Sequence, residues 1–97
     1  MIITKYWQVD WLHDTPEDPV TIYSEIGEDG YETRKVHIYP DGRMLRADEH
    51  HESREIGLGE IPVGDIADVA AQPEFHAKVV TREVFENAWE RASWSSP

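Results

Sequence analysis

The chain has 97 residues, with nine Lys and Arg against twenty Asp and Glu, so its formal net charge is −11 at pH 7. A chain of this length predicts a single domain, residues 1–97, because domains usually contain ~100–200 residues. The negative charge disfavours binding to a nucleic-acid backbone, since that binding needs cations to displace counterions. The absence of cysteine excludes disulfides, thiolate zinc sites and a cysteine nucleophile.

The composition predicts a folded protein without a membrane segment. Four Trp, four Tyr and 39 % hydrophobic residues bring more apolar surface than a disordered chain carries. A basic region followed by ~7–15 apolar residues is absent from the N-terminus, and no run of ~18 apolar residues occurs. We therefore expect a cytoplasmic protein with an ordered core over about residues 4–92 and a frayed tail over residues 93–97. In that tail, Trp94 either folds back or stays exposed.

The first expected element is a strand over residues 5–13, in which Trp7, Val9 and Trp11 point to one side. This period of two is typical of a half-buried strand. Residues 14–19 form an acidic loop after it, because their two prolines lack an amide donor and their carboxylates favour turns.

A hairpin follows, with strands over residues 20–26 and 32–39. Gly27 and Gly30 between them can adopt the positive φ that a hairpin turn requires.

Two registers are open for this hairpin. One sets Glu25 directly opposite Glu32, whereas the other pairs Glu25 with Arg34 and Tyr23 with Val36. We prefer the second register because it removes a like-charge contact across the strands.

The next segment predicts a second hairpin. Residues 39–43 contain Pro40 and Gly42, which suit a tight turn into a strand over residues 43–47. Residues 48–59 show no sustained period and predict a mobile charged loop.

Helices are expected near the C-terminus. Residues 63–71 have apolar positions at helical spacing and predict a helix, which Pro73 terminates. Residues 75–80 form a short strand or extended link. Thr81 can cap a last amphipathic helix over residues 82–92. The predicted class is α+β, with an antiparallel meander of about four to five strands and two C-terminal helices packed on one face.

Several different short motifs occur along the chain in a specific order. In the first half they are Trp11-Leu12-His13-Asp14, Pro19, Tyr23-Ser24-Glu25, Gly30-Tyr31-Glu32, Arg34-Lys35-Val36 and Asp41-Gly42-Arg43. In the second half they are Leu58-Gly59-Glu60-Ile61-Pro62, Pro73-Glu74-Phe75 and residues 85–89. In this order the chain resembles a family of small bacterial proteins classed only as a domain of unknown function. The resemblance covers roughly residues 5–90 and implies one complete domain, without an activity, substrate or site.

The histidines are the first candidates for a metal site. His50 and His51 are adjacent, so on an extended chain they point to opposite sides, and no His-x-x-x-His spacing occurs. The pair also lies outside the pattern shared with the resembled family. We therefore predict a solvated loop, with no metal and no cofactor. Whether His37 meets these two residues stays open.

The end of the first strand offers an acid/base pair, His13 and Asp14, beside Trp11. The alternative is that Asp14 caps the turn and that His13 packs against a Tyr, and we favour it because a turn-forming Asp before Pro is ordinary. We predict no catalytic residue in the chain.

Glu25 and Arg34 lie in the middle of predicted strands. They form either a cross-strand ion pair on the solvent face or part of a recessed polar site, and the first is favoured because such pairs are common. Tyr23, Tyr31 and Tyr39 are expected to add aromatic rings on the sheet face that no helix covers. An exposed aromatic and charged face would be a binding surface.

The predicted binding surface consists of Trp11, His13, Asp14, Tyr23, Glu25, Tyr31 and Arg34. The leading hypothesis is a non-catalytic acidic binding or regulatory module that engages a protein partner, concretely an immunity protein against a basic toxin, because its acids would steer a cationic partner. Nucleic acid and membrane are not expected partners. A second hypothesis is a small enzyme or small-molecule binder whose cleft is lined by four of these residues: His13, Asp14, Glu25 and Arg34. A third is an accessory protein that oligomerises through an unpaired sheet edge.

Overall fold

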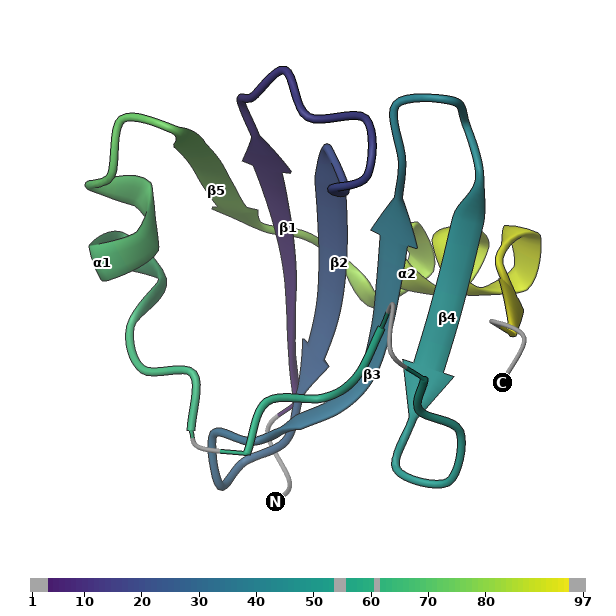
Figure 1. Cartoon of the computed structure of the whole chain (residues 1–97). Helices are drawn as coiled ribbons and strands as arrows, with labels where there is room; N and C mark the ends of the chain where they lie inside the picture. The colour runs from purple at the N-terminus through teal and green to yellow at the C-terminus, as the bar shows by residue number, and fades with distance from the viewer. Residues whose placement is uncertain (1–3, 54–55, 61, 95–97) are drawn as a thin grey trace.

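A computed structural model of the protein describes residues 4–53, 56–60 and 62–94. Its centre is one six-stranded sheet in the order β5-β1-β2-β3-β4-β6 (Figure 1). The strands are β1 (Lys5–Trp11), β2 (Thr21–Ile26), β3 (Glu32–Ile38), β4 (Met44–Asp48), β5 (Phe75–Val79) and β6 (Ser93–Trp94), and the helices are α1 (Ile66–Ala70) and α2 (Arg82–Arg91). All neighbouring strands are antiparallel except β4 and β6, which are parallel. The α+β class is confirmed, and the sheet has more strands than the four to five expected.

Tight turns join β2 to β3 and β3 to β4, as the glycines predict. Gly30 has a φ of 86° and Gly42 a φ of 91°, which are left-handed conformations that favour glycine. In the second turn the Tyr39 amide donates to the Arg43 carbonyl over 2.9 Å. Because both connections are this short, the strands can only run antiparallel.

The preferred register of the first hairpin is confirmed. Glu25 pairs with Arg34 and Tyr23 with Val36. The register shifts between Glu25 and Ile26, so that Ile26 rather than Glu25 lies opposite Glu32. The irregularity therefore keeps the two glutamates from facing each other directly.

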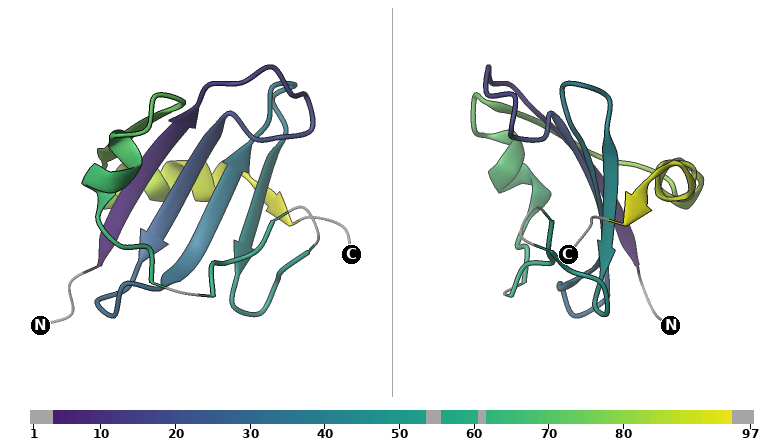
Figure 2. Two further views of the ribbon diagram at one scale, coloured as in Figure 1. Left: turned by 60° about the vertical axis from the view of Figure 1, so that its left-hand side comes forward. Right: turned by 45° about the vertical axis from the view of Figure 1, so that its right-hand side comes forward.

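Helix α2 crosses one face of the sheet, as both views in Figure 2 show. Its N-cap is Thr81, whose side-chain oxygen accepts from the Val84 amide over 3.3 Å, as expected. Phe85 and Ala88 are its buried residues. This apolar stripe explains why α2 packs onto the sheet.

Helix α1 lies on the opposite side of the sheet from α2 (Figure 2), so the expectation that both helices pack on one face is wrong. Asp65 caps α1 by accepting from the Ala67 amide, but the helix has only five residues and none of them is buried. It packs beside β5, the strand that separates it from α2 in the chain. A helix this short has too little apolar surface to cover a sheet.

The sheet carries apolar clusters on both faces. The cluster under α2 consists of Val36, Phe85, Ala88 and Ala92, and the cluster on the opposite face consists of Tyr39, Leu45, Ala47 and Ile56. Ile56 lies in the segment expected to be a mobile charged loop, yet it is only 2 % exposed. Part of this loop is therefore held against the sheet by burial of one apolar side chain.

The C-terminal segment was expected to be frayed over residues 93–97. Ser93 and Trp94 instead form β6, which pairs with Leu45 and Arg46 of β4. Residues 95–97 lie outside the described part of the chain. Among the described residues, no helix has the length and the apolar character needed to cross a membrane.

Candidate functional site

The expected site residues at the end of β1 brace a loop. The Trp11 and His13 rings meet edge to face, with centroids 4.5 Å apart. The Thr15 amide donates to Nδ1 of His13 over 3.0 Å, so Nε2 carries the proton and donates to the Pro19 carbonyl over 2.8 Å. His13 packs against Trp11 rather than the expected Tyr. Because the loop occupies both ring nitrogens, His13 has no free nitrogen for acid/base chemistry, and Asp14 is exposed beside it.

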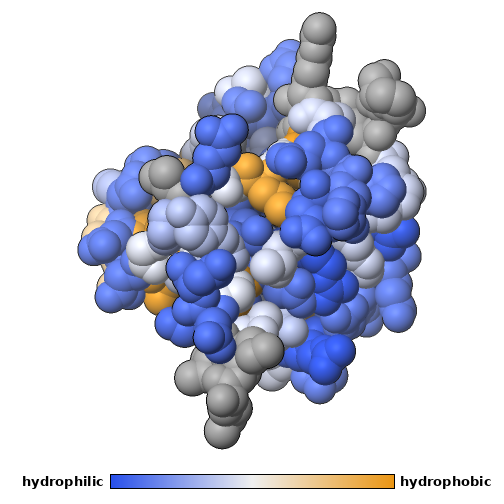
Figure 3. Space-filling model, turned by 90° about the horizontal axis from the view of Figure 1, so that it is seen from below, coloured by the Kyte–Doolittle hydropathy of each residue, from blue (hydrophilic) through white to orange (hydrophobic). Residues whose placement is uncertain are grey.

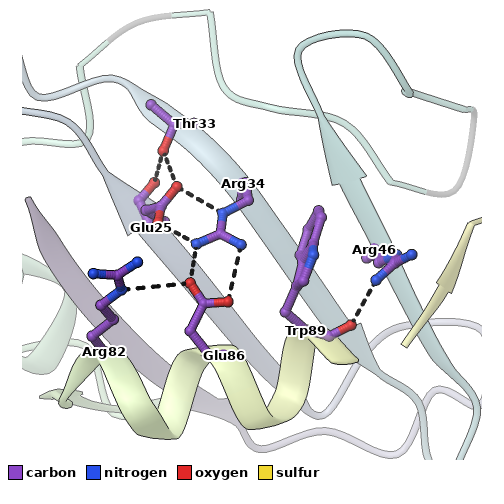
Figure 4. A network of polar contacts seen from close by, with 7 residues as sticks. All are labelled: Glu25, Thr33, Arg34, Arg46, Arg82, Glu86 and Trp89. Carbon is purple, nitrogen blue, oxygen red and sulfur yellow. Dashed lines mark hydrogen bonds and ion pairs between the residues drawn. The ribbon is translucent and has the colours of Figure 1, made fainter. Parts of the chain in front are cut away.

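Glu25 and Arg34 form the expected cross-strand pair, but α2 covers it, so its expected place on the solvent face is wrong. Arg34 Nε donates to Glu25 Oε1 over 2.8 Å, and Nη1 donates to Glu86 of α2 over 3.3 Å (Figure 4). The Arg34 guanidinium also lies 4.8 Å from the ring centroid of Phe85 and 4.9 Å from that of Trp89. The pair thus fastens the helix to the sheet.

The electrostatics keep this cluster charged. Burial raises the pKa of Glu25, but hydrogen bonds from Arg34 and Thr33 outweigh it and leave that pKa below its usual value. The hydrogen bond from Arg34 likewise lowers the pKa of Glu86. The hydrogen bond to Glu25 raises the pKa of Arg34. All three groups are therefore charged at neutral pH and satisfy one another rather than a ligand.

The expected tyrosine patch does not form. Tyr23 is half-buried against the cluster beneath α2, and Tyr39 is 3 % exposed in the cluster on the opposite face. Tyr31 is 41 % exposed at the β2–β3 hairpin. The three rings therefore belong to separate surroundings, and the uncovered aromatic sheet face predicted from the sequence is absent from the part of the molecule that is described.

The histidines do not converge. His51 Nδ1 contacts Asp48 Oδ1 at 2.9 Å, whereas His37 Nδ1 is 3.5 Å from the Tyr39 hydroxyl. Within the described ranges, no group of three or more His, Cys, Asp or Glu side chains is placed to hold a metal ion. Burial lowers the pKa of His37 to about 4, so this residue is neutral at pH 7.

Trp94, whose place the sequence left open, contributes to a stack of side chains at the edge of the sheet. The Arg46 guanidinium carbon is 4.9 Å from the ring centroid of Trp89 and 4.4 Å from that of Trp94. The His51 ring stacks on Trp94 at 4.2 Å, with an angle of 24° between the planes. Trp94 therefore folds back and closes the β4 edge.

The structure also contains a groove that the sequence analysis did not find. Two adjoining hollows of about 380 and 430 Å³ share Lys5, Trp7 and Gly64 as lining residues. We call them together the Trp7 groove. One side is the N-terminal end of β1 with the β2–β3 hairpin, and the other consists of residues 63–66, which lead into α1. These segments are more than 30 positions apart in the sequence, so no local pattern could have revealed their contact.

Comparison with known proteins places this chain in a family. Residues 5–94 match the family described as a domain of unknown function, DUF6881. The chain belongs to the DUF6881 family. Neither a curated protein nor a solved structure matches it.

The DUF6881 match covers every element described above, because it begins at the first residue of β1 and ends at the last residue of β6. It therefore includes the Arg34 cluster, the Trp94 stack and both walls of the Trp7 groove. The family description assigns no activity.

Proposed function

We propose that this DUF6881 protein is a non-catalytic acidic binding or regulatory module that engages a basic protein partner. The observation that carries the proposal is the sign of the exposed charge. Among the described residues, thirteen Asp and Glu are exposed against five Lys and Arg. Such a surface attracts a cationic protein and accelerates its association.

The buried carboxylates do not contribute to this surface. Glu25 is used by Arg34, and Glu32 accepts from Ser24 and Lys35 on the other face of the sheet. Each of these contacts pairs a cation with a carboxylate, so they leave the excess of acids on the exterior. The excess is therefore a property of the folded surface.

The most concrete form of the proposal is immunity toward a basic toxin that acts on nucleic acid. Such a toxin needs a cationic surface to hold phosphates, and an acidic protein can occupy the same surface. A chain without cysteine suits the reducing cytoplasm, and with the motif resemblance we propose a bacterial cytoplasmic protein.

The contacts at the alternative site favour binding over catalysis. His13 is engaged at both nitrogens, while Glu25 and Arg34 are held under α2. Glu25 pairs with Tyr6 near the start of β1, whereas His13 follows the end of that strand. The side chains of the hypothetical cleft thus lie at opposite ends of the sheet.

The test is capture of a partner from source-cell lysate by the immobilised protein at low and at high salt. We expect one dominant basic protein that is released by high salt and also by excess duplex DNA, because salt screens exposed charges and DNA competes for the cationic surface. A partner with an acidic surface, or capture that salt and DNA leave unchanged, would contradict the proposal.

A further inference from the structure

Apolar side chains form part of the lining of the Trp7 groove. Trp7 and Ile26, which are 6 % and 2 % exposed, line it from the sheet. Val63 and Ile66 line it from the opposite side, and Val79 of β5 lies at its mouth with 63 % exposure. Seen from below, the molecule shows hydrophobic areas set among a mostly hydrophilic surface (Figure 3). Each hollow is within the ~300–1,000 Å³ typical of ligand pockets.

The walls of the groove are fixed by backbone contacts. The Val63 amide donates to the Gly30 carbonyl over 2.9 Å, which joins the segment before α1 to the hairpin. A side chain at Gly30 would come within 3.3 Å of Pro62, so the close approach depends on glycine there. A groove held in this way can receive a ligand without first ordering its walls.

Two acids, Glu28 and Asp65, line the groove. The two chain segments that flank it, residues 27–30 and 56–70, contain five acids and no Lys, Arg or His. These acids are Glu28, Asp29, Glu60, Asp65 and Asp68. Lys5 is the one basic residue in the lining. A groove that combines apolar side chains with two carboxylates suits a side chain with an aliphatic stem and a cationic end.

We propose that the Trp7 groove receives an extended basic segment of the protein partner. An Arg or Lys of that segment lays its stem against Trp7 and Val79 and brings its charge to Glu28 and Asp65. This inference rests on the proposed function. It assigns the partner's contact to the Trp7 groove rather than to the acidic surface as a whole. The two adjoining hollows accommodate more than one side chain, which favours a peptide segment over a small free cation.

The direct test uses ¹H–¹⁵N NMR spectra of the full chain with three probes: a short peptide of alternating Arg and Leu, its twin with Glu in place of Arg, and spermidine. We expect the Arg peptide to shift the Trp7 indole signal and the Gly27 and Gly64 amides, and the Glu peptide to shift none of them. Equal shifts with spermidine would overturn the assignment to a protein segment. Shifts spread over all exposed acids would overturn the groove itself.

A matched pair of variants localises the effect. Glu28→Lys with Asp65→Ser removes the two acids of the groove lining, while Ser keeps the N-cap of α1. Glu17→Lys with Asp14→Ser makes the same change in net charge in the loop after β1, which lies at the far end of the sheet. We expect the first pair to weaken binding of the Arg peptide on the order of tenfold and the second pair to change this binding little. Equal weakening would show that only net charge matters and would overturn the inference.

The same variants separate this inference from the proposed function. If the groove variant, shown to be folded by its NMR dispersion, still captures the salt-sensitive partner, the groove is not the contact and the proposed function stands. If no basic partner is captured by the wild-type chain, the proposed function fails whether or not the peptide binds.

Discussion

Arg34 of β3 donates to Glu25 of β2 and also to Glu86 of α2, a residue 52 positions further along the chain. One guanidinium thus joins two neighbouring strands to the helix that covers them (Figure 4). Arg82 adds a weaker contact to Glu86 at 3.8 Å. Since two carboxylates share this cation, its removal leaves them close together with only the contacts from Arg82 and Thr33.

Replacing Arg34 with Met should therefore lower the free energy of unfolding by about 2 kcal/mol. Breaking a fully buried ion pair costs about 3–5 kcal/mol, and the partial exposure of Glu86, at 32 % of its side chain, moderates the loss. Urea unfolding measures the change. Arg91→Met, at an exposed position of α2, is the control and should change stability by less than about 0.5 kcal/mol. Equal losses in the two variants would show that the Arg34 cluster does not hold α2.

This ion pair also shows how far the sequence leads. The Glu25–Arg34 register was predictable because the alternative sets two glutamates face to face, a conflict visible in the sequence. The partnership with Glu86 was not, because the side of the sheet on which a terminal helix packs depends on contacts across the whole chain. The same holds for Trp94, since a strand of two residues has no period to detect.

Burial of His37 predicts a dependence of stability on pH. Burial lowers the pKa of His37 from 6.5 to about 4, and Lys35 lowers it further than Glu32 raises it. Between these two values the unfolded chain binds a proton that the folded chain does not. The free energy of unfolding therefore falls as pH falls through this window, by up to about 1.4 kcal/mol per pH unit. Below about pH 4 the loss of stability due to His37 is complete. Urea unfolding at a series of pH values measures the slope.

The variant His37→Phe should flatten this slope, because it removes the buried group that resists protonation. His50→Phe, at an exposed position in the loop after β4, should leave the slope unchanged. Glu25 has a lowered pKa, so its stabilising contribution is present above the usual carboxyl value of 4.5 and is lost only as pH falls below it. A slope above pH 4.5 that persists in His37→Phe would assign the effect to another group.

The Trp94 ring, at the edge of the sheet, should contribute to the free energy of unfolding. Trp94→Ala removes the contacts of this ring with Arg46 and His51, and we expect a loss of about 1 kcal/mol, since one exposed cation–π contact contributes about 0.5–1 kcal/mol. Urea unfolding gives the loss, and near-ultraviolet circular dichroism reports the ordered indole. Leu12→Ala, at a side chain that is 56 % exposed, is the control. No difference between the two would mean that the stack contributes nothing to stability.

Gly42 isolates the cost of backbone conformation in the β3–β4 turn. Its φ is 91°, and a Cβ placed there would meet no atom within 4 Å, so a substitution introduces strain without a clash. Gly42→Ala should lower the free energy of unfolding by about 1–2 kcal/mol, because an L-residue pays for the left-handed region. Gly42→Asn should lose less, since Asn tolerates this region better than other residues. Urea unfolding of both variants provides the comparison, and an Ala variant as stable as the wild-type chain would show that the turn relaxes to a negative φ.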